Sequence, residues 1–386
     1  MTVSIADRGT LAVLAPAITK ALHISEASYG WLASAFSMAY LVGTPLAGWW
    51  IDRVGARRGL LVSVVTWSFV AALHAIVPGF GTLFAMRIAL GIAEGPSFPG
   101  TAQVMRRVLP AADQPRGFGV IFTGSSLGGL LAPPLASWLY GVAGWRLACV
   151  GTAVFGLLWV PIWLAVTGRP AVAAQLDAAG PARTATRRPL LEVARHPLVI
   201  RAIIAILALS PAANLFSAWS AKYLVARFHL AQTQVGHYLW APAIFLDAGA
   251  LLFGDLAARS RERRGHAPPR ALFALGAVIA GSISLLPFVA TPWHAVLVIG
   301  LALMGGGGVY AVTTGDLMQR VPPEAAASAG GLIAAGQSLA LIVANPIAGW
   351  AIEHGYSYPD LGIACALWII PGALIWLLWV PADRMT

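Results

Sequence analysis

The chain has 386 residues, of which 58% are hydrophobic and only 10% are charged, whereas soluble proteins carry roughly 25% charged residues. This composition excludes a soluble globular protein and favours a chain that crosses a membrane several times. The net charge of +10 does not indicate nucleic-acid binding, because only two of the 25 basic residues are lysines and most arginines lie between apolar segments, as the positive-inside bias requires.

The apolar segments predict twelve membrane-spanning helices, since each span needs about 20 mostly apolar residues. In chain order the expected spans are 1–22, 27–51, 59–78, 82–107, 116–141, 145–168, 198–226, 233–258, 271–290, 293–318, 328–353 and 359–381. No stretch alternates apolar and polar residues as the strands of a membrane β-barrel do. The predicted fold class is therefore an all-α membrane protein with twelve transmembrane helices.

The distribution of arginines predicts the topology. They gather in the loops 52–58, 106–116, 169–197 and 259–270, while the alternate loops hold few basic residues. The positive-inside rule then places both termini in the cytoplasm, with the protein in the inner (plasma) membrane of the cell. The two cysteines, Cys149 and Cys365, lie inside apolar segments and do not indicate a disulfide framework.

A long hydrophilic segment divides the spans into two sets of six. Residues 169–197, rich in Ala, Pro and Arg, are expected to link an N-terminal bundle, 1–168, to a C-terminal bundle, 198–386. A repeat supports this division, because nine residues of the fifth span recur 212 positions later in the eleventh. They are Gly119, Ile121, Gly124, Ser126, Leu127, Ala132, Pro134, Ala136 and Trp138, which correspond to Gly331, Ile333, Gly336, Ser338, Leu339, Ala344, Pro346, Ala348 and Trp350. Two pseudo-symmetric six-helix bundles are typical of transporters.

Three motifs carry a resemblance to a known family. Residues 48–58 read Gly-Trp-Trp-Ile-Asp-Arg-Val-Gly-Ala-Arg-Arg and resemble the G-x-x-x-D-R-x-G-x-R-R signature of the major facilitator superfamily. Residues 6–16 contain D-R-x-x-L-x-x-x-x-P and residues 87–99 contain R-x3-G-x2-E-x4-P. These patterns are similar to the first and fourth helices of the anion:cation symporter family, whose members include hexuronate and galactonate symporters. In the second half, Ala258 replaces the signature aspartate, which predicts a weaker copy of the loop.

Ionisable residues inside a membrane are costly to bury and are therefore candidates for function. Arg87 and Glu94 lie two turns apart on one helix face. An arginine can grip a carboxylate with two parallel hydrogen bonds, and a glutamate in a low-dielectric cavity can take up and release a proton. The alternative is a mutual or interhelical ion pair that only stabilises the fold. The resemblance implies that Arg8 and Arg87 hold the substrate carboxylate and that Asp7 and Glu94 carry protons. The alternative for Asp7 and Arg8 is a pair of ordinary charges at a helix end.

The signature loop predicts a conformational latch built from Asp52, Arg53, Arg57 and Arg58. The aspartate can meet the N-terminus of a neighbouring helix and pair with arginines when the cytoplasmic side is closed. The alternative is a solvated loop that only sets topology.

The seventh span contains a cluster of aromatic and cationic residues. Trp219 could stack on a sugar ring while Lys222 adds positive charge, and the alternative is an interfacial aromatic belt with a snorkelling lysine. Asp316 is interpreted as structural, and Gly305 to Gly308 are interpreted as permitting close helix packing.

The sequence contains no Walker loop, no metal-ligand cluster and no nucleophile–base motif, so neither an enzyme, a cofactor nor a metal is predicted. The resemblance implies a secondary active transporter that imports a small organic anion, such as a hexuronate or an aldonate, with protons by alternating access. A proton-antiporting exporter or an organic-anion exchanger of the same fold is the alternative. A signalling receptor is disfavoured, because no substantial soluble output domain is present. The expected partners are the anion, protons and the lipid bilayer, with no nucleic acid, and the expected state is a monomer.

Overall fold

The computed structural model describes residues 1–110, 113–177, 189–264, 269–379 and 381. These residues form helices and turns, with no strand among them. The chain divides into two compact units: unit 1 comprises Met1–Arg183 with Ser220–Trp240, and unit 2 comprises Thr184–Trp219 with Ala241–Thr386. The expected halves 1–168 and 198–386 stay a prediction. Residues 178–188 of the expected linker, and the side chains of Arg263 and Arg264 in the second copy of the signature loop, lie outside the described residues.

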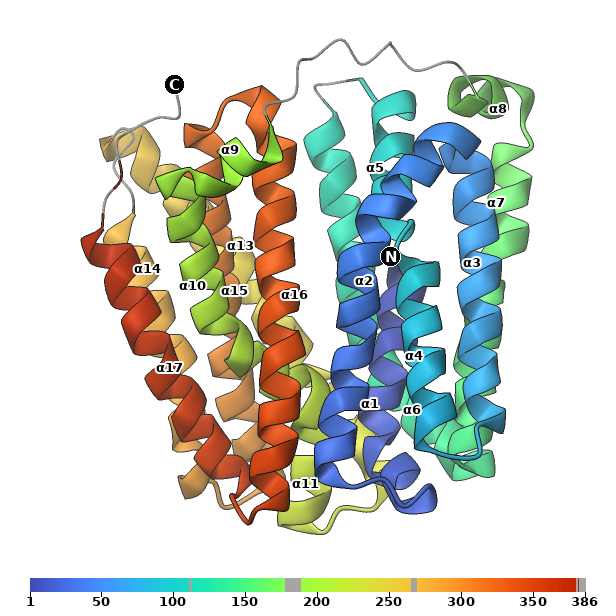
Figure 1. Cartoon of the computed structure of the whole chain (residues 1–386), viewed down its shortest axis with the longest axis vertical. Coiled ribbons are helices and arrows are strands. Elements are labelled where there is room, and N and C mark those ends of the chain that lie inside the picture. The colour runs from blue at the N-terminus through green and yellow to red at the C-terminus, as the bar shows by residue number, and fades with distance from the viewer. Residues whose placement is uncertain (111–112, 178–188, 265–268, 380, 382–386) are drawn as a thin grey trace. The chain divides into compact units, whose positions relative to one another are not determined.

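Unit 1 is built from long helices that pack side by side. Its elements are α1 (Thr2–Ala21), α2 (Glu26–Val54), α3 (Ala56–Leu73), the 3-10 helix η1 (His74–Ile76), α4 (Phe80–Glu94), α5 (Ser97–Val108), α6 (Gln114–Leu157), α7 (Trp159–Thr167) and α8 (Pro170–Asp177), joined by α11 (Ser220–Phe228) and α12 (Gln232–Leu239). The first helix packs on α6, α2 packs on α4, and α12 packs on α6. Figure 1 shows α2, α4 and α3 as neighbouring, roughly parallel helices.

Unit 2 has the same all-helical character. Its elements are α9 (Leu190–Arg195), α10 (Pro197–Asn214), the π-helix η2 (Leu215–Trp219), α13 (Ala241–Arg264), α14 (Arg270–Ala280), the 3-10 helix η3 (Gly281–Phe288), α15 (Pro292–Arg320), α16 (Pro323–Glu353) and α17 (Tyr358–Leu378). Figure 1 shows α10 beside both α16 and α17.

Glycines bring α13 and α15 into close contact. A Cβ atom at Gly307 would lie 2.5 Å from the carbonyl oxygen of Leu246, and one at Gly308 would lie 2.6 Å from the Phe253 ring. A larger residue at either position would force the neighbouring helix to move. The close-packing interpretation therefore holds for Gly305, Gly307 and Gly308, whereas a Cβ atom at Gly306 would have no neighbour within 4 Å.

Several predicted spans differ in detail from the structure. The expected helix 82–107 divides into α4 and α5 at Gly95 and Pro96, because proline has no N–H to continue the helical hydrogen bonds. The long helix α6 covers the fifth expected span and the first part of the sixth, which continues as α7. Helix α6 breaks at Ala143 and Gly144. Gly144 has φ 77°, a left-handed conformation that glycine adopts without steric cost.

The chain is an all-α, multi-pass membrane protein. Among the described residues, eight helical segments are long and apolar enough to cross a membrane. They cover nine of the twelve expected spans, because the segment Thr123–Thr167 contains two of them. The expected spans 1–22, 27–51 and 82–107 are helical but are not among the eight. Charged residues in α1 and many serines and glycines in α2 reduce their apolar character, while α4 and α5 are each too short to span.

Candidate functional site

Close contacts between α2 and α4 shape the candidate site in unit 1. A Cβ atom at Gly91 on α4 would lie 2.6 Å from the carbonyl oxygen of Phe36 on α2. One turn further, a Cβ atom at Gly95 would lie 3.1 Å from the backbone of Gly43. These glycines of the R-x3-G-x2-E-G pattern let the two helices approach, and the aromatic residues of α2 therefore meet the charged residues of α4.

Arg8 and Glu94 form an ion pair that joins α1 to α4. The Nε atom of Arg8 lies 2.6 Å from Oε2 of Glu94, whose side chain is fully buried, while the side chain of Arg8 is 26% exposed. Ser4, one turn before Arg8, donates its hydroxyl to the same oxygen at 2.7 Å. The other oxygen, Oε1, is buried and has no hydrogen-bond partner among the described residues. Spacing along the sequence placed Glu94 near Arg87 on one helix, whereas the structure pairs it with Arg8 across two helices.

Aromatic rings hold the two arginines of the site close together. The Arg8 guanidinium lies 4.6 Å from the ring centroids of both Phe36 and Tyr40, and these rings stack 5.5 Å apart. Arg87 is buried and lies 5.3 Å from the Phe36 ring. Its Nε atom has no hydrogen-bond partner in the described part of the chain. Cation–π contacts therefore position both guanidinium groups and leave a donor of Arg87 available to an anion.

Asp7 lies on a different face of α1 from Arg8, toward α3 and α6. A Cβ atom at Gly156 on α6 would lie 3.6 Å from Oδ2 of Asp7 and 2.9 Å from the hydroxyl of Ser68 on α3. Asp7 is buried, and neither of its carboxyl oxygens has a hydrogen-bond partner among the residues described. An unpaired carboxylate is costly to bury, so this carboxyl group suits a proton carrier.

Lys222 on α11 is buried against the first two helices of unit 1. Its Nζ atom lies 2.9 Å from Oε1 of Glu26 and 3.0 Å from Oγ1 of Thr19, and 4.9 Å from the centroid of the Tyr29 ring. The ammonium group thus has a carboxylate, a hydroxyl and an aromatic ring as partners. Its assignment to the substrate stays a prediction.

Trp219 ends the π-helix η2 in unit 2. Its side chain is fully buried, and its indole Nε1 donates to Oδ1 of Asn345 at 3.1 Å. The ring also lies 6.4 Å from that of Tyr358. Trp219 is therefore packed among unit 2 helices in this structure, and its contact with a sugar ring also stays a prediction.

The residues expected to form the latch lie at the junction of α2 and α3: Asp52, Arg53, Arg57 and Arg58. Gly55 makes the turn between these helices with φ 84°, so the signature glycine has a backbone role. Asp52 is exposed and accepts a hydrogen bond from Nε2 of Gln103 at 3.2 Å. The guanidinium of Arg53 lies 3.5 Å from the Trp49 ring. The latch itself stays a prediction.

Unit 2 contains a buried charged cluster that the sequence analysis missed. Arg201 on α10 lies 3.3 Å from Oδ2 of Asp316 on α15, and Arg320 lies 3.1 Å from Oδ1 of the same residue. Arg201 also donates to the carbonyl oxygen of Trp376 on α17 at 2.7 Å. The cluster thus ties together α10, α15 and α17, in keeping with a structural Asp316. The signal was available, because Arg201 is an ionisable residue inside the predicted span 198–226.

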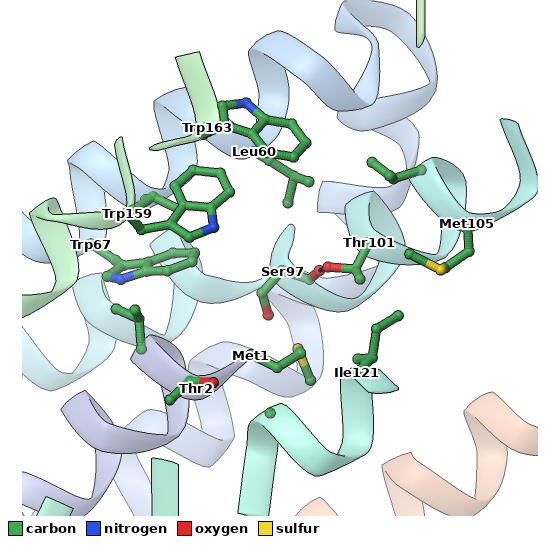
Figure 2. Close-up of a pocket in the computed structure, with 14 residues that line it drawn as sticks. Met1, Thr2, Leu60, Trp67, Ser97, Thr101, Met105, Ile121, Trp159 and Trp163 are labelled. Atoms are coloured by element: carbon green, nitrogen blue, oxygen red, sulfur yellow. Dashed lines mark hydrogen bonds between the residues drawn. The ribbon is translucent and has the colours of Figure 1, made fainter. Parts of the chain in front are cut away.

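A cavity of about 230 Å³ lies elsewhere in unit 1, near the start of α1. Figure 2 shows Trp67, Trp159 and Trp163 together on one side of it. Its polar lining includes Ser97 and Thr101 but no charged side chain. Within the described ranges, no group of three or more His, Cys, Asp or Glu residues is placed to bind a metal ion.

Comparisons with known proteins bear on the family and the fold. A family model described as Major Facilitator Superfamily matches residues 1–345. The galacturonate transporter of Dickeya chrysanthemi is 27% identical over 259 residues, which cover 64% of this chain and 75% of that protein. The hexuronate transporter of Escherichia coli (strain K12) is 24% identical over 386 residues, which cover 95% and 88% of the two chains. A solved bacterial homologue of the human lysosomal transporter Spinster has the same fold, with a TM-score of 0.80, 16% identity and coverage of 99% and 96%.

Proposed function

This chain belongs to the major facilitator superfamily, and from that premise we propose that it imports a small organic anion together with protons by alternating access. The proposed substrate is a sugar acid, such as a hexuronate or an aldonate. The observation that carries the proposal is the Arg8–Glu94 ion pair, which lies beside a second buried arginine, Arg87. The names of the relatives, a galacturonate and a hexuronate transporter, support the substrate class.

Arg8 and Arg87 are the proposed ligands of the substrate carboxylate. A guanidinium group offers several donors in one plane, which suits a carboxylate with two oxygens. Leaving a buried donor without a partner costs free energy, and the Nε atom of Arg87 is such a donor among the described residues. An incoming carboxylate would supply the missing acceptor.

Glu94 couples the substrate to protons in this proposal, because it competes with the substrate for Arg8. A carboxylate that binds Arg8 displaces Glu94 from the cation 2.6 Å away. The buried Glu94 then lacks a counter-charge, and a buried charge without a partner is strongly unfavourable. Proton uptake by Glu94 removes that charge. Asp7, buried and without a hydrogen-bond partner among the described residues, is the proposed second proton carrier.

The remaining parts of the proposal concern topology and gating. We place both termini in the cytoplasm on the basis of the arginine distribution. We also propose that the protein lies in the inner (plasma) membrane and is a monomer. Asp52, Arg53, Arg57 and Arg58 form the proposed cytoplasmic latch. The chain is proposed to divide into two bundles, 1–168 and 198–386. Trp219 and Lys222 are proposed to contact the sugar in another state of the transport cycle.

Uptake into proteoliposomes tests the proposal. Labelled glucuronate and galactonate are supplied outside, with and without an inward proton gradient. We expect the gradient to stimulate uptake of at least one acid and Arg87→Ala to abolish it. Arg227→Ala removes an exposed cation from α11 and is the matched control, which should retain uptake.

Four other outcomes would change parts of the assignment. No uptake of either acid by a folded preparation would contradict the proposed substrate class. Efflux from loaded vesicles driven by an inward proton gradient would identify a proton antiporter, and uptake only in the presence of an anion on the opposite side would identify an exchanger. Uptake that does not change with the membrane potential would exclude a stoichiometry of two protons for each monovalent anion.

A further inference from the structure

Ser4 contacts the central carboxyl group of the site but belongs to none of the motifs. Its side chain is fully buried, and its hydroxyl donates to Oε2 of Glu94 at 2.7 Å. Ser4 precedes Arg8 by one helical turn, so both donors reach Oε2 from the same face of α1. Of the groups that the structure describes, only these two lie within hydrogen-bond distance of Glu94.

The two oxygens of Glu94 have different surroundings. Oε2 accepts from both Ser4 and Arg8, whereas Oε1 is buried and accepts no hydrogen bond from the described residues. A proton can therefore bind at Oε1 while Ser4 keeps its contact with Oε2. A hydroxyl that donates to a carboxylate favours the ionised form over the protonated one.

We propose that Ser4 is a positioning residue that limits how tightly Glu94 holds its proton, an inference that rests on the proposed proton coupling. When the substrate carboxylate draws Arg8 away, the Ser4 hydroxyl remains as a donor to Glu94. It keeps the carboxyl group against α1 and stabilises its ionised form. Glu94 can then release the proton and bind Arg8 again after the substrate has left.

Other charged or titratable groups interact with Glu94 electrostatically. Besides Arg8, which also donates to Oε2, they are the amino group of Met1, the side chain of Asp7 on α1 and the side chain of Arg87 on α4. Those that interact with one of these arginines are Tyr29 and Tyr40 from α2, His74 from η1 and Cys149 from α6. All of them remain in place when the Ser4 hydroxyl is removed, so Ser4→Ala isolates its effect.

The test compares the full-length protein with Ser4→Ala in proteoliposomes. Without the hydroxyl, Glu94 should hold its proton more tightly, so proton-driven uptake should persist to higher external pH. We expect the pH of half-maximal uptake on the alkaline side to rise by about one unit, which is tenfold in proton affinity. Ser4→Thr keeps a hydroxyl and should restore a midpoint close to that of the unchanged protein.

A second measurement does not depend on transport. Difference infrared spectroscopy can follow the carboxylic acid C=O band that Glu94→Gln removes, and the pH midpoint of this band should shift upward in Ser4→Ala. Failure of the unchanged protein to show proton-driven uptake would contradict the proposed function. The infrared titration would still test the role of Ser4 in that case.

Ser63→Ala is the matched control. The buried Ser63 on α3 donates to the carbonyl oxygen of Ala93, the residue before Glu94, and does not touch the carboxyl group. We expect Ser63→Ala to lower stability without moving either midpoint. Unchanged midpoints in Ser4→Ala, with uptake reduced equally at every pH, would overturn the proposal and leave Ser4 a purely structural role. An equal shift in Ser63→Ala would overturn it as well.

Discussion

Replacing Glu94 by glutamine removes the charge that holds Arg8 while keeping the shape of the side chain. To bind Arg8, a substrate carboxylate must displace Oε2 of Glu94, which lies 2.6 Å from Nε of Arg8. Hydrogen bonds to charged groups contribute about 1.5–3 kcal/mol and neutral ones about 0.5–1.5 kcal/mol, so Glu94→Gln should make the displacement easier by about 1–1.5 kcal/mol. Because 1.4 kcal/mol corresponds to tenfold in affinity, we expect the sugar acid to bind about five- to tenfold more tightly.

Calorimetric titration of the purified protein over a range of pH measures this affinity. Because Glu94→Gln has no carboxylate to compete for Arg8, its affinity for the substrate should vary less with pH than that of the unchanged protein. In vesicles, the variant should exchange substrate across the membrane but lose proton-driven accumulation. Glu353→Gln removes an exposed carboxylate at the end of α16 and should behave like the unchanged protein. Weaker binding by Glu94→Gln, or an unaltered pH dependence, would refute competition between Glu94 and the substrate.

Three further predictions concern packing and buried charge. Gly91→Ala places a Cβ atom 2.6 Å from a carbonyl oxygen of α2 and should lower the free energy of unfolding by about 1–3 kcal/mol. In the control, Gly306→Ala, the new Cβ atom has no neighbour within 4 Å, and the free energy of unfolding should not fall. Asp316→Asn leaves two buried arginines without their carboxylate and should lower the free energy of unfolding by about 3 kcal/mol or more. Its control, Asp255→Asn at an exposed position, should lower it by about 0.5 kcal/mol or less. Thermal unfolding compares each pair, and equal losses within a pair would contradict the argument. Lys222→Met removes the ion pair of α11 and should raise amide hydrogen exchange across Ser220–Trp240; unchanged exchange would show that the pair contributes little.

The positions of the charged residues could be predicted from the sequence, but their partners could not. Arg8, Arg87 and Glu94 stand out because ionisable residues are rare within apolar segments, and the structure brings all three to one region of unit 1. The spacing of Arg87 and Glu94 placed both on one helix face and left open a mutual or an interhelical ion pair. The ion pair of Glu94 is interhelical, with Arg8, because the glycines of α4 and the packing of α1 decide which faces meet.

Site residues of common types, such as serine and phenylalanine, could not be predicted from the sequence. A serine or a phenylalanine in an apolar helix is common, so nothing in the sequence marked Ser4 as a ligand of Glu94 or Phe36 as a platform for Arg8. Arg201 is different, because its charge within an apolar segment was visible. Its role still required the packing of unit 2, which supplies Asp316 and the carbonyl oxygen of Trp376.

The segments that form unit 1 have a consequence for the synthesis of the protein. Unit 1 includes the later segment Ser220–Trp240. In this segment, the backbone N–H of Gly236 donates to the hydroxyl of Ser137 on α6 at 2.9 Å. Nε2 of Gln232 donates to the carbonyl oxygen of Val13 at 2.7 Å. During synthesis, the first helices therefore leave the ribosome before the segment that completes their packing exists. A polypeptide that stops in the segment 169–197 lacks part of its own unit, and a second polypeptide carrying the remainder would supply it. Two fragments produced separately in one cell would thus have complementary surfaces on which to reassemble.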